Sequence, residues 1–242
     1  MFSGRMMRTI VVSDIHGYYD EFRNLLSSVQ YNPLSDQLYL LGDYMDRGAK
    51  GREVLQYVHI LSKHANTKVI GGNHDDMFLA WLDNKDYELS PYTNEKNGGT
   101  ETILSFCPFF QPGVNDGEAR KWILLHYTEE INFLRDLPDF IEDELHIFVH
   151  AGIDPSFTDW KETGKKDFRW IRNKFYDVPN PHRKTIVFGH TSCSVLRENE
   201  ENFDVWFSER KIGIDGGAKF GGQLNALVID DGKYSTVSVK VD

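Results

Sequence analysis

Short apolar runs alternate with polar clusters along this chain, and each run ends directly before polar residues or glycine. Runs of about four to six apolar residues that end in this way are typical of buried strands. Helix-like segments near 18–30, 50–63 and 75–84 separate the first three runs, which predicts βαβ units and a largely parallel sheet. The five expected strands cover residues 9–13, 37–41, 67–70, 146–149 and 184–188.

The segment from 84 to 140 has a different pattern. Residues 97–100, which read Asn-Gly-Gly-Thr, are typical of a turn. Residues 118–137 predict one amphipathic helix, because apolar side chains recur there at helical spacing and form a stripe. We interpret this stripe as core packing. It consists of Ile123, Tyr127, Ile131 and Leu134.

The C-terminal part of the chain predicts further strands, separated by the turn signals Gly221-Gly222 and Asp231-Gly232. We expect these strands to form a second, antiparallel sheet that packs on the first. The expected fold class is therefore α/β, a layered sandwich, and the chain length suits one domain over residues 1–242. The three expected strands cover residues 211–214, 226–229 and 235–241.

The composition narrows the class of protein. With 40% apolar and 13% aromatic residues the chain can bury a core without disulfides, so we interpret Cys107 and Cys193 as free thiols. A net charge of −10 repels polyanions, and we expect no nucleic-acid partner. The first residues lack an apolar stretch suited to a signal peptide or a membrane span, so we expect a cytoplasmic protein without a membrane partner. The oligomeric state stays open.

Side chains with metal-binding atoms follow all five expected strands of the first pattern. Asp14 and His16 are two positions apart, so on an extended segment both point to the same face and can reach one metal. The two oxygens of Asp43 could bridge two ions, and side chains after the last three strands could complete a second site. These oxygen and nitrogen donors, with no thiolate, favour manganese, iron or zinc over a structural cysteine site. The last three side chains are Asn73, His150 and His190.

These residues belong to five longer motifs: Ser13-Asp-Ile-His-Gly17, Gly42-Asp-Tyr-Met-Asp-Arg-Gly48, Gly72-Asn-His-Asp75, His150-Ala-Gly152 and Gly189-His190. The series resembles the signature of the phosphoprotein phosphatase (PPP) family within the calcineurin-like metallophosphoesterase superfamily. The bacterial branch of small serine/threonine protein phosphatases is the part of the family that it resembles most. The resemblance extends to Asn97-Gly-Gly99, Trp170-Ile-Arg172 and Asp215-Gly-Gly-Ala218.

The resemblance implies a four-layer α-β-β-α sandwich with mixed sheets and two divalent metal ions. Manganese is the expected metal, with iron or zinc as alternatives. A hydroxide that bridges the two ions would attack phosphorus in line, so that no phosphoenzyme intermediate is needed. By the family pattern, the first ion is bound by Asp14, His16 and Asp43, and the second by Asp43, Asn73, His150 and His190.

The resemblance also implies catalytic and phosphate-binding side chains. His74 would protonate the leaving oxygen, and Asp46 would hydrogen-bond His74 and favour its imidazolium form. Arg47 and Arg172 would contact the non-bridging phosphate oxygens in two-point contacts and stabilise the transition state. The expected phosphate-binding set is Arg47, Arg172, Asn73 and His74.

Three positions near the motifs qualify the resemblance. Arg169 lies three residues from Arg172, and we expect it to contact solvent or an acidic neighbour instead of phosphate. Ser13 replaces a glycine that is common in the family, and both residues are small. Asp75 replaces a more usual glutamate, so a carboxylate that orients a neighbouring group would have a shorter arm, with no metal ligand lost.

The expected function is metal-dependent hydrolysis of a phosphomonoester, most of all in phosphoserine or phosphothreonine proteins. The alternative is hydrolysis of a dinucleoside tetraphosphate, which would favour additional Lys or Arg in the mostly acidic segment 84–145. Metal-dependent phosphodiesterases and nucleases rank next, but they commonly carry Gly-His-x-His where this chain has Gly189-His-Thr-Ser192. A non-catalytic metal-binding module ranks last, because every expected ligand and the acid are present.

Overall fold

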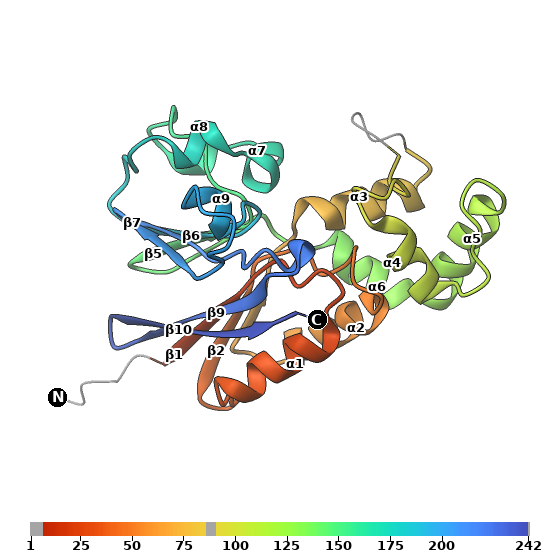
Figure 1. The fold of residues 1–242 in the computed structure, drawn as a ribbon, viewed down its shortest axis with the longest axis horizontal. Helices are drawn as coiled ribbons and strands as arrows, with labels where there is room; N and C mark the ends of the chain where they lie inside the picture. The colour runs from red at the N-terminus through yellow and green to blue at the C-terminus, as the bar shows by residue number, and fades with distance from the viewer. Residues whose placement is uncertain (1–6, 86–90, 242) are drawn as a thin grey trace.

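The computed structural model describes residues 7–85 and 91–241 of the chain. Two five-stranded sheets pack face to face, with helices on both outer faces (Figure 1). This arrangement is the expected α/β sandwich of four α-β-β-α layers, and both sheets are mixed. Among the described residues, no helix is both long and apolar enough to span a membrane.

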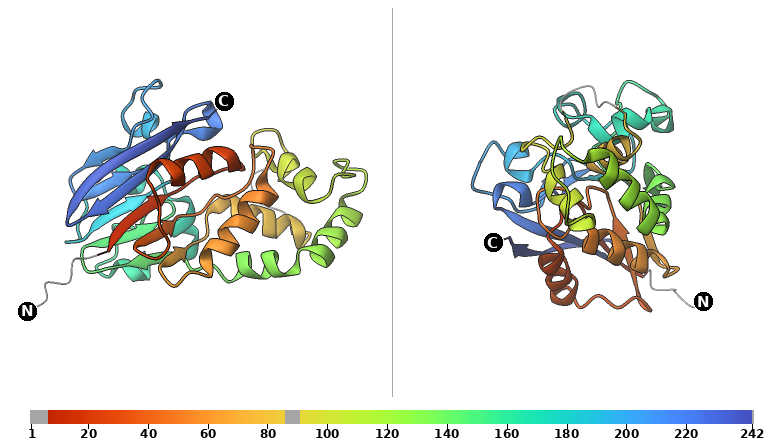
Figure 2. Two further views of the ribbon diagram at one scale, coloured as in Figure 1. Left: turned by 90° about the horizontal axis from the view of Figure 1, so that it is seen from below. Right: turned by 90° about the vertical axis from the view of Figure 1, so that its right-hand side faces the viewer.

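The first sheet has the strand order β10-β9-β1-β2-β3. The strands β1, β2 and β3 are parallel, as the βαβ pattern predicts, whereas β9 runs antiparallel beside β1 and β10 antiparallel beside β9. The blue C-terminal strands therefore lie beside the red N-terminal strand (Figures 1 and 2). The bounds are β1 (Arg8–Val12), β2 (Asp36–Leu40), β3 (Thr67–Val69), β9 (Gln223–Asp230) and β10 (Lys233–Lys240).

The second sheet has the order β4-β5-β6-β8-β7. Its three central strands are parallel, and a short antiparallel strand closes each edge. The bounds are β4 (Phe140–Glu142), β5 (His146–Val149), β6 (Thr185–Phe188), β7 (Trp206–Ser208) and β8 (Lys211–Gly213).

Alternate residues of the central strands pack in different hydrophobic cores, because successive side chains of a strand point to opposite faces of the sheet. In β1, Val11 packs between the sheets, whereas Ile10 and Val12 face the helices. In β5, Phe148 packs between the sheets and Ile147 faces the outer helices of the second sheet. Strands buried on both faces read as continuous apolar runs, and this explains the pattern in the sequence.

Six helices form the layer on the first sheet, and those from α3 onward extend past the edge of the sheet (Figure 1). They are α1 (Tyr19–Ser28), α2 (Gly51–Ser62), α3 (Asn73–Leu82), α4 (Gly99–Phe106), α5 (Asp116–His126) and α6 (Thr128–Arg135). Shorter helices cover the second sheet: α7 (Lys165–Trp170), α8 (Asn173–Tyr176), α9 (Cys193–Leu196) and the 3-10 turn η1 (Trp160–Glu162). A second 3-10 turn, η2, spans Ala218–Phe220.

The prediction of one helix over 118–137 is wrong, because two helices meet at Tyr127. Tyr127 has φ −128° and ψ 33°, and it is both the C-cap of α5 and the N-cap of α6. The Thr128 hydroxyl donates to the Leu124 carbonyl at 2.8 Å across this break. The expected stripe still packs in the core, since Ile123 and Ile131 are buried and Tyr127 packs against the same cluster.

The expected sheet memberships also need correction. The five strands of the first pattern divide between the two sheets instead of sharing one. The C-terminal strands do not form a separate antiparallel sheet, because β9 and β10 complete the first sheet and β8 pairs in parallel with β6. All but the last residue of β9 is buried, because β1 and β10 flank its edges and its two faces pack in the cores on either side of the sheet.

Local expectations elsewhere are confirmed. Cys107 and Cys193 are free and buried. The expected turn at 97–100 contains Gly98 in the left-handed region, after which α4 begins.

Arg169 is a buried cation that ties the helical layers to the loop before β4. Its side chain is 2% exposed and contacts Asp76 at 2.7 Å and Asp139 at 2.8 Å. Its Nη2 also donates to the Leu137 carbonyl at 3.1 Å. Arg169 therefore contacts acidic neighbours, as expected, and it does not contact solvent.

We predict that Arg169→Met lowers the free energy of unfolding by about 3 kcal/mol, because it leaves two carboxylates without their buried partner. Urea denaturation measures this change. The matched control is Lys85→Met, which removes an ion pair of a side chain that is 71% exposed. We expect the control to stay within about 0.5 kcal/mol of the parent protein. Equal effects of both substitutions would contradict the structural role of Arg169.

Candidate metal centre

The six expected metal ligands lie together at one end of the two sheets. Four come from the first sheet and the helix after it, and two from loops that follow strands of the second sheet. All six are buried, with at most 3% of the residue exposed. They are Asp14 and His16 after β1, Asp43 after β2, Asn73 at the start of α3, His150 after β5 and His190 after β6.

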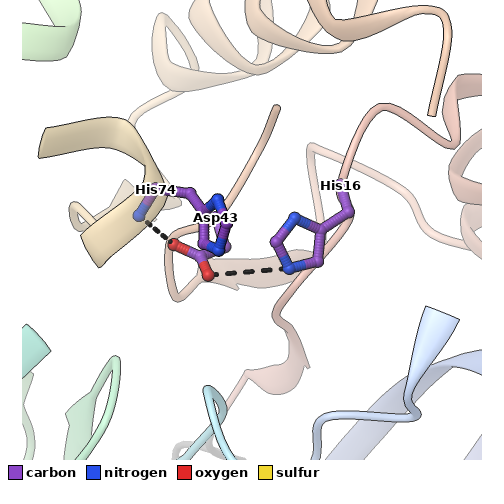
Figure 3. A group of neighbouring side chains, drawn as sticks. All are labelled: His16, Asp43 and His74. Atoms are coloured by element: carbon purple, nitrogen blue, oxygen red, sulfur yellow. Dashed lines mark hydrogen bonds and ion pairs between the residues drawn. The ribbon is translucent and has the colours of Figure 1, made fainter. Parts of the chain in front are cut away.

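The first group of ligand atoms surrounds one oxygen of Asp43. His16 Nε2 lies 3.6 Å from Asp43 Oδ2 and 3.9 Å from Asp14 Oδ1. The other oxygen, Asp43 Oδ1, accepts a hydrogen bond of 2.9 Å from the backbone N–H of His74 (Figure 3). The ligand atoms of His16, Asp43 and His74 all lie within 4.8 Å of one another.

The second group surrounds the side-chain oxygen of Asn73. His150 Nε2 lies 2.9 Å and His190 Nδ1 2.8 Å from Asn73 Oδ1. His150 Nε2 is also 3.4 Å from Asp43 Oδ1, so Asp43 belongs to both groups. The carboxylate of Asp43 therefore lies between the two groups of ligand atoms.

Hydrogen bonds to backbone carbonyls orient two of the imidazoles. His16 Nδ1 lies 2.9 Å from the Met45 carbonyl, and His150 Nδ1 lies 2.7 Å from the Leu41 carbonyl. A carbonyl only accepts, so each Nδ1 carries a proton, and each ring in its neutral form presents a lone pair at Nε2. Those lone pairs face the oxygens of Asp43 and Asn73, which also present lone pairs. A divalent cation satisfies such a convergence, and this is the arrangement that metal-binding histidines have.

The electrostatics of the cluster also favour a cation. Burial, followed by the nearby Asp215, raises the pKa of the Asp14 carboxyl to about 8. Burial lowers the pKa of His16 well below its usual value, so its ring is a neutral donor. For His150, burial lowers the pKa, but the Asp43 and Asp14 carboxylates and the Leu41 carbonyl together outweigh burial and raise it to about 9. A positive charge at the centre would stabilise the carboxylates and take the place of the proton on His150.

The backbone at the site is strained in the way that functional sites often are. In the described part of the chain, six of the eleven non-glycine residues with positive φ are candidate site residues. Such conformations cost about 1–3 kcal/mol each and persist only where surrounding contacts hold them. The six are Asp14, His16, Asp43, Asp46, Arg47 and His190.

Hydrogen bonds between two loops stabilise part of this strained backbone. The loop after β1 and the loop after β2 share backbone hydrogen bonds, among them His16 N–H to Asp43 O at 3.0 Å and Gly48 N–H to His16 O at 2.9 Å. Glycine is required at the crossing, because a Cβ on Gly17 would lie 2.4 Å from the Gly48 carbonyl oxygen. The motif glycines therefore allow the loops to approach closely enough to bring Asp14, His16 and Asp43 together.

Asp75 supports the ligands through the backbone. Its Oδ2 accepts from the N–H of Asp43 at 3.0 Å and of Gly72 at 2.7 Å, and its Oδ1 accepts from Tyr44 N–H at 3.2 Å. The shorter arm of aspartate thus reaches the loop after β2 from the first turn of α3. This carboxylate orients the segment that carries Asp43 and contacts no metal-ligand side chain in these hydrogen bonds.

His74 and Asp46 form the expected pair. His74 Nδ1 lies 2.6 Å from Asp46 Oδ2, and Asp46 is fully buried. Two hydroxyl groups contact the other oxygen of the same carboxylate: Tyr92, and Thr102 at 2.7 Å.

The two arginines differ in their surroundings. Arg47 is half-buried, and its Nε is a buried atom without a hydrogen-bond partner among the described residues. Arg172 is exposed at the N-terminal boundary of α8, and its charge, after burial and His150, lowers the pKa of His190. The charge of Arg172 is therefore near the second group of ligands, whereas Arg169 is part of the core.

Sequence reasoning missed the roles of four residues near the cluster. The pKa shifts place the charges of Asp215 and Lys219 close to it, because Asp215 raises the pKa of Asp14 and Lys219 lowers that of His16. Both lie in the glycine-rich segment after β8, which the sequence marks but does not connect to the ligands. Tyr92 and Thr102 contact Asp46, and no pattern in the sequence links them to residue 46.

Two bacterial relatives of this chain carry the same description. A symmetrical bis(5'-nucleosyl)-tetraphosphatase from Actinobacillus pleuropneumoniae serotype 5b (strain L20) is 47% identical over 205 residues, covering 84% of this chain and 62% of the relative. One of the same name from Histophilus somni (strain 2336) is 34% identical over 172 residues, covering 69% of this chain and 52% of the relative. The matched regions thus span about half to three fifths of these relatives.

A solved structure agrees in fold. The crystal structure of a candidate diadenosine tetraphosphatase superposes with a TM-score of 0.65 at 20% identity, covering 97% of this chain and 93% of that one. A protein serine/threonine phosphatase from Saccharomyces cerevisiae superposes with the same TM-score of 0.65, at 13% identity, covering 100% of this chain and 82% of that one. The two bacterial relatives above carry the description that the sequence gives as the alternative. Residues 7–212 match the family described as calcineurin-like phosphoesterases. Together with the two groups of ligand atoms around Asp43, this match shows that the chain belongs to the calcineurin-like phosphoesterase family.

Proposed function

We propose that this protein is a hydrolase that uses two divalent cations to cleave a dinucleoside tetraphosphate. The observation that carries the proposal is the convergence of lone-pair atoms at Asp43: His16 and His150 lie against its two oxygens, and Asn73 Oδ1 lies against His150. The names of the relatives support the tetraphosphate over the phosphoprotein that the sequence favours. Because the site draws on both sheets, we also propose that residues 1–242 work as one domain.

The proposed ligands are divided as the sequence predicts, and manganese is the metal that we propose. Bound there, the two cations would lower the pKa of a water and polarise the phosphoryl oxygens, which supplies a nucleophile near neutral pH. The residues that we propose as ligands are Asp14, His16 and Asp43 for one ion, and Asp43, Asn73, His150 and His190 for the other.

Positive side chains of the chain would bind and orient the phosphate. We propose that Arg47 and Arg172 contact the non-bridging oxygens from two sides, since a planar guanidinium matches two oxygens at once. The unpartnered Nε of Arg47 supports this role, because a buried donor without an acceptor is available to a ligand. A polyphosphate would need additional positive charge, and segment 84–145 is mostly acidic. Lys219, which lies outside that segment, supplies a positive charge near His16 and His190.

We propose that His74 is the general acid. The proton on its Nδ1 is held by the carboxylate of Asp46, so its Nε2 is the atom that can give a proton to the leaving oxygen. The ring lies beside that of His16, with centroids 4.9 Å apart, which puts the acid next to the first group of ligands. Asn73 and His74 are adjacent, so α3 would position one ligand and the acid together.

We predict that removal of divalent metal by a chelator abolishes hydrolysis of p-nitrophenyl phosphate and that Mn²⁺ restores it. The reason is that the proposed nucleophile is a water whose pKa the two cations would lower. Elemental analysis must verify metal removal, and His150→Gln should lower the Mn²⁺ content whereas His182→Gln, outside the site, should not. Full activity of verified metal-free protein would contradict the proposal.

We predict that His74→Asn lowers kcat by about 10²–10⁴ on a phosphoester with a poor leaving group, because general acid catalysis contributes about that factor. Steady-state kinetics on phenyl phosphate measures the loss, and elemental analysis should find the parent Mn²⁺ content. An unchanged kcat on phenyl phosphate would exclude His74 as the acid.

We predict that kcat/KM is highest for diadenosine tetraphosphate in a comparison with a phosphoserine peptide and bis(p-nitrophenyl) phosphate. Chromatography of the products should find ADP alone, as symmetrical cleavage requires. A preference for the phosphopeptide would support the protein phosphatase that the sequence favours. A preference for the diester would contradict both assignments.

A further inference from the structure

The carboxylate of Asp46 has more partners than the His74 pair requires. Its Oδ2 faces His74 Nδ1 at 2.6 Å, whereas its Oδ1 accepts from the hydroxyl groups of Tyr92 and Thr102. Both hydroxyls come from segment 91–102, which lies outside the strand-end loops that carry the metal ligands. All four residues are at most 6% exposed, so water does not compete for these hydrogen bonds.

The direction of each hydrogen bond follows from its partners. The Thr102 hydroxyl accepts from the backbone N–H of Asp46 at 2.7 Å, so its own proton is directed to Asp46 Oδ1 at 2.7 Å. Tyr92 can only donate to the carboxylate, and burial followed by Asp46 raises its pKa well above the usual value, which keeps its proton in place. With Oδ1 held by two donors, Oδ2 is left to accept from His74.

Segment 91–102 also holds the backbone next to Asp46. The N–H of Arg47 donates to the Gly98 carbonyl at 3.1 Å, and both Asp46 and Arg47 have positive φ, at 72° and 73°. Gly98 has φ 74°, and a Cβ there would lie 2.5 Å from Arg47 N. Two consecutive strained residues are thus supported by one segment, through a carbonyl and two hydroxyls.

The two hydroxyls sit on rigid supports. The Tyr92 ring packs against Phe78 and Trp81, with centroids 5.9 Å and 6.2 Å away. Thr102 lies within α4 and is fully buried. A hydroxyl on a packed ring or on a helix interior fixes the rotamer of the group that it contacts.

We propose that the hydroxyls of Tyr92 and Thr102 are positioning groups that hold Asp46, and through it the His74 ring, for proton delivery to the leaving oxygen. The inference rests on the general-acid role proposed above for His74. Both hydroxyls contact the carboxylate of Asp46, and neither residue is in the phosphate-binding set proposed above. Their effect on the reaction is therefore transmitted by His74 alone, and this separates positioning from a general effect on folding.

The inference has a specific kinetic signature. A leaving group that departs easily as an anion needs little help from an acid, whereas a poor one depends on it. Loss of either hydroxyl should therefore slow phenyl phosphate far more than p-nitrophenyl phosphate. A merely structural role would slow both substrates alike.

The experiment uses the Mn²⁺-loaded full chain and four single variants. Tyr92→Phe and Thr102→Val each remove one hydroxyl with little change of shape, and Thr102→Ser keeps the hydroxyl as a rescue. Tyr31→Phe is the matched control, because it removes a hydroxyl that contacts Thr67 at 3.3 Å, away from the centre. For each protein, kcat and KM are measured on both aryl phosphates, together with the melting temperature.

We expect Tyr92→Phe and Thr102→Val to lower kcat on phenyl phosphate roughly 10-fold to 100-fold, the factor expected for a lost hydrogen bond to a charged group. On p-nitrophenyl phosphate we expect less than about a 3-fold loss, on the same leaving-group argument. Thr102→Ser and Tyr31→Phe should retain the parent rates. Equal losses on both substrates, or parent rates in both Tyr92→Phe and Thr102→Val, would overturn the inference.

The double variant His74→Asn/Tyr92→Phe separates this inference from the proposed function. If Tyr92 acts through His74, the double variant should be no slower on phenyl phosphate than His74→Asn. A further loss of the single-variant size would overturn the positioning role. If His74→Asn itself slows both substrates equally, the general-acid proposal fails, and the positioning inference fails with it. If His74→Asn is selective and Tyr92→Phe is not, only the inference about positioning fails.

Discussion

Atoms that can only accept, or that present lone pairs, crowd around the carboxylate of Asp43, and the rest of the architecture holds them there. The Nε2 atoms of His16 and His150 lie 3.6 Å and 3.4 Å from the oxygens of this carboxylate. His150 Nε2 also lies 2.9 Å from the side-chain oxygen of Asn73. The Nδ1 of each imidazole donates its proton to a backbone carbonyl. Such an arrangement is unfavourable without a cation. The strained backbone at Asp14, His16 and Asp43 and the close contact of Gly17 with Gly48 are the means by which the chain maintains it.

The sandwich supplies what a single sheet would not. The first sheet carries Asp14, His16 and Asp43, whereas His150 and His190 arrive on loops of the second. The core between the sheets, which includes Val11 and Phe148, therefore sets the distance between the two halves of the cluster. On the helical side, Asp75 fixes the Asp43 loop, and Arg169 ties Asp76 to the segment before β4.

The ligand set was readable from the sequence because each ligand follows an apolar run directly, and parallel strands end at a common edge. The distribution of strands between two sheets was not readable, since a strand such as β9, buried in all but its last residue, has no solvent-exposed face to indicate its neighbours. The break at Tyr127 left the apolar spacing almost unchanged, so the pattern alone predicts one helix. Tyr92 and Thr102 escaped notice because tertiary packing alone brings them to Asp46, at separations of 46 and 56 residues.

The pairing of β1 with β9 determines when the site becomes rigid. β1 carries Asp14 and His16, and its edge is hydrogen-bonded to a strand from the far end of the described chain, with Thr9 opposite Ile229. At about 5–20 residues per second, synthesis would separate these two strands by roughly ten to forty seconds. Until then, the edge of β1 is open, and pairings between such distant segments are slow to form. Asp14 and His16 are thus made long before β9, which completes their final surroundings, so a nascent chain would carry an incomplete cluster until β9 pairs with β1.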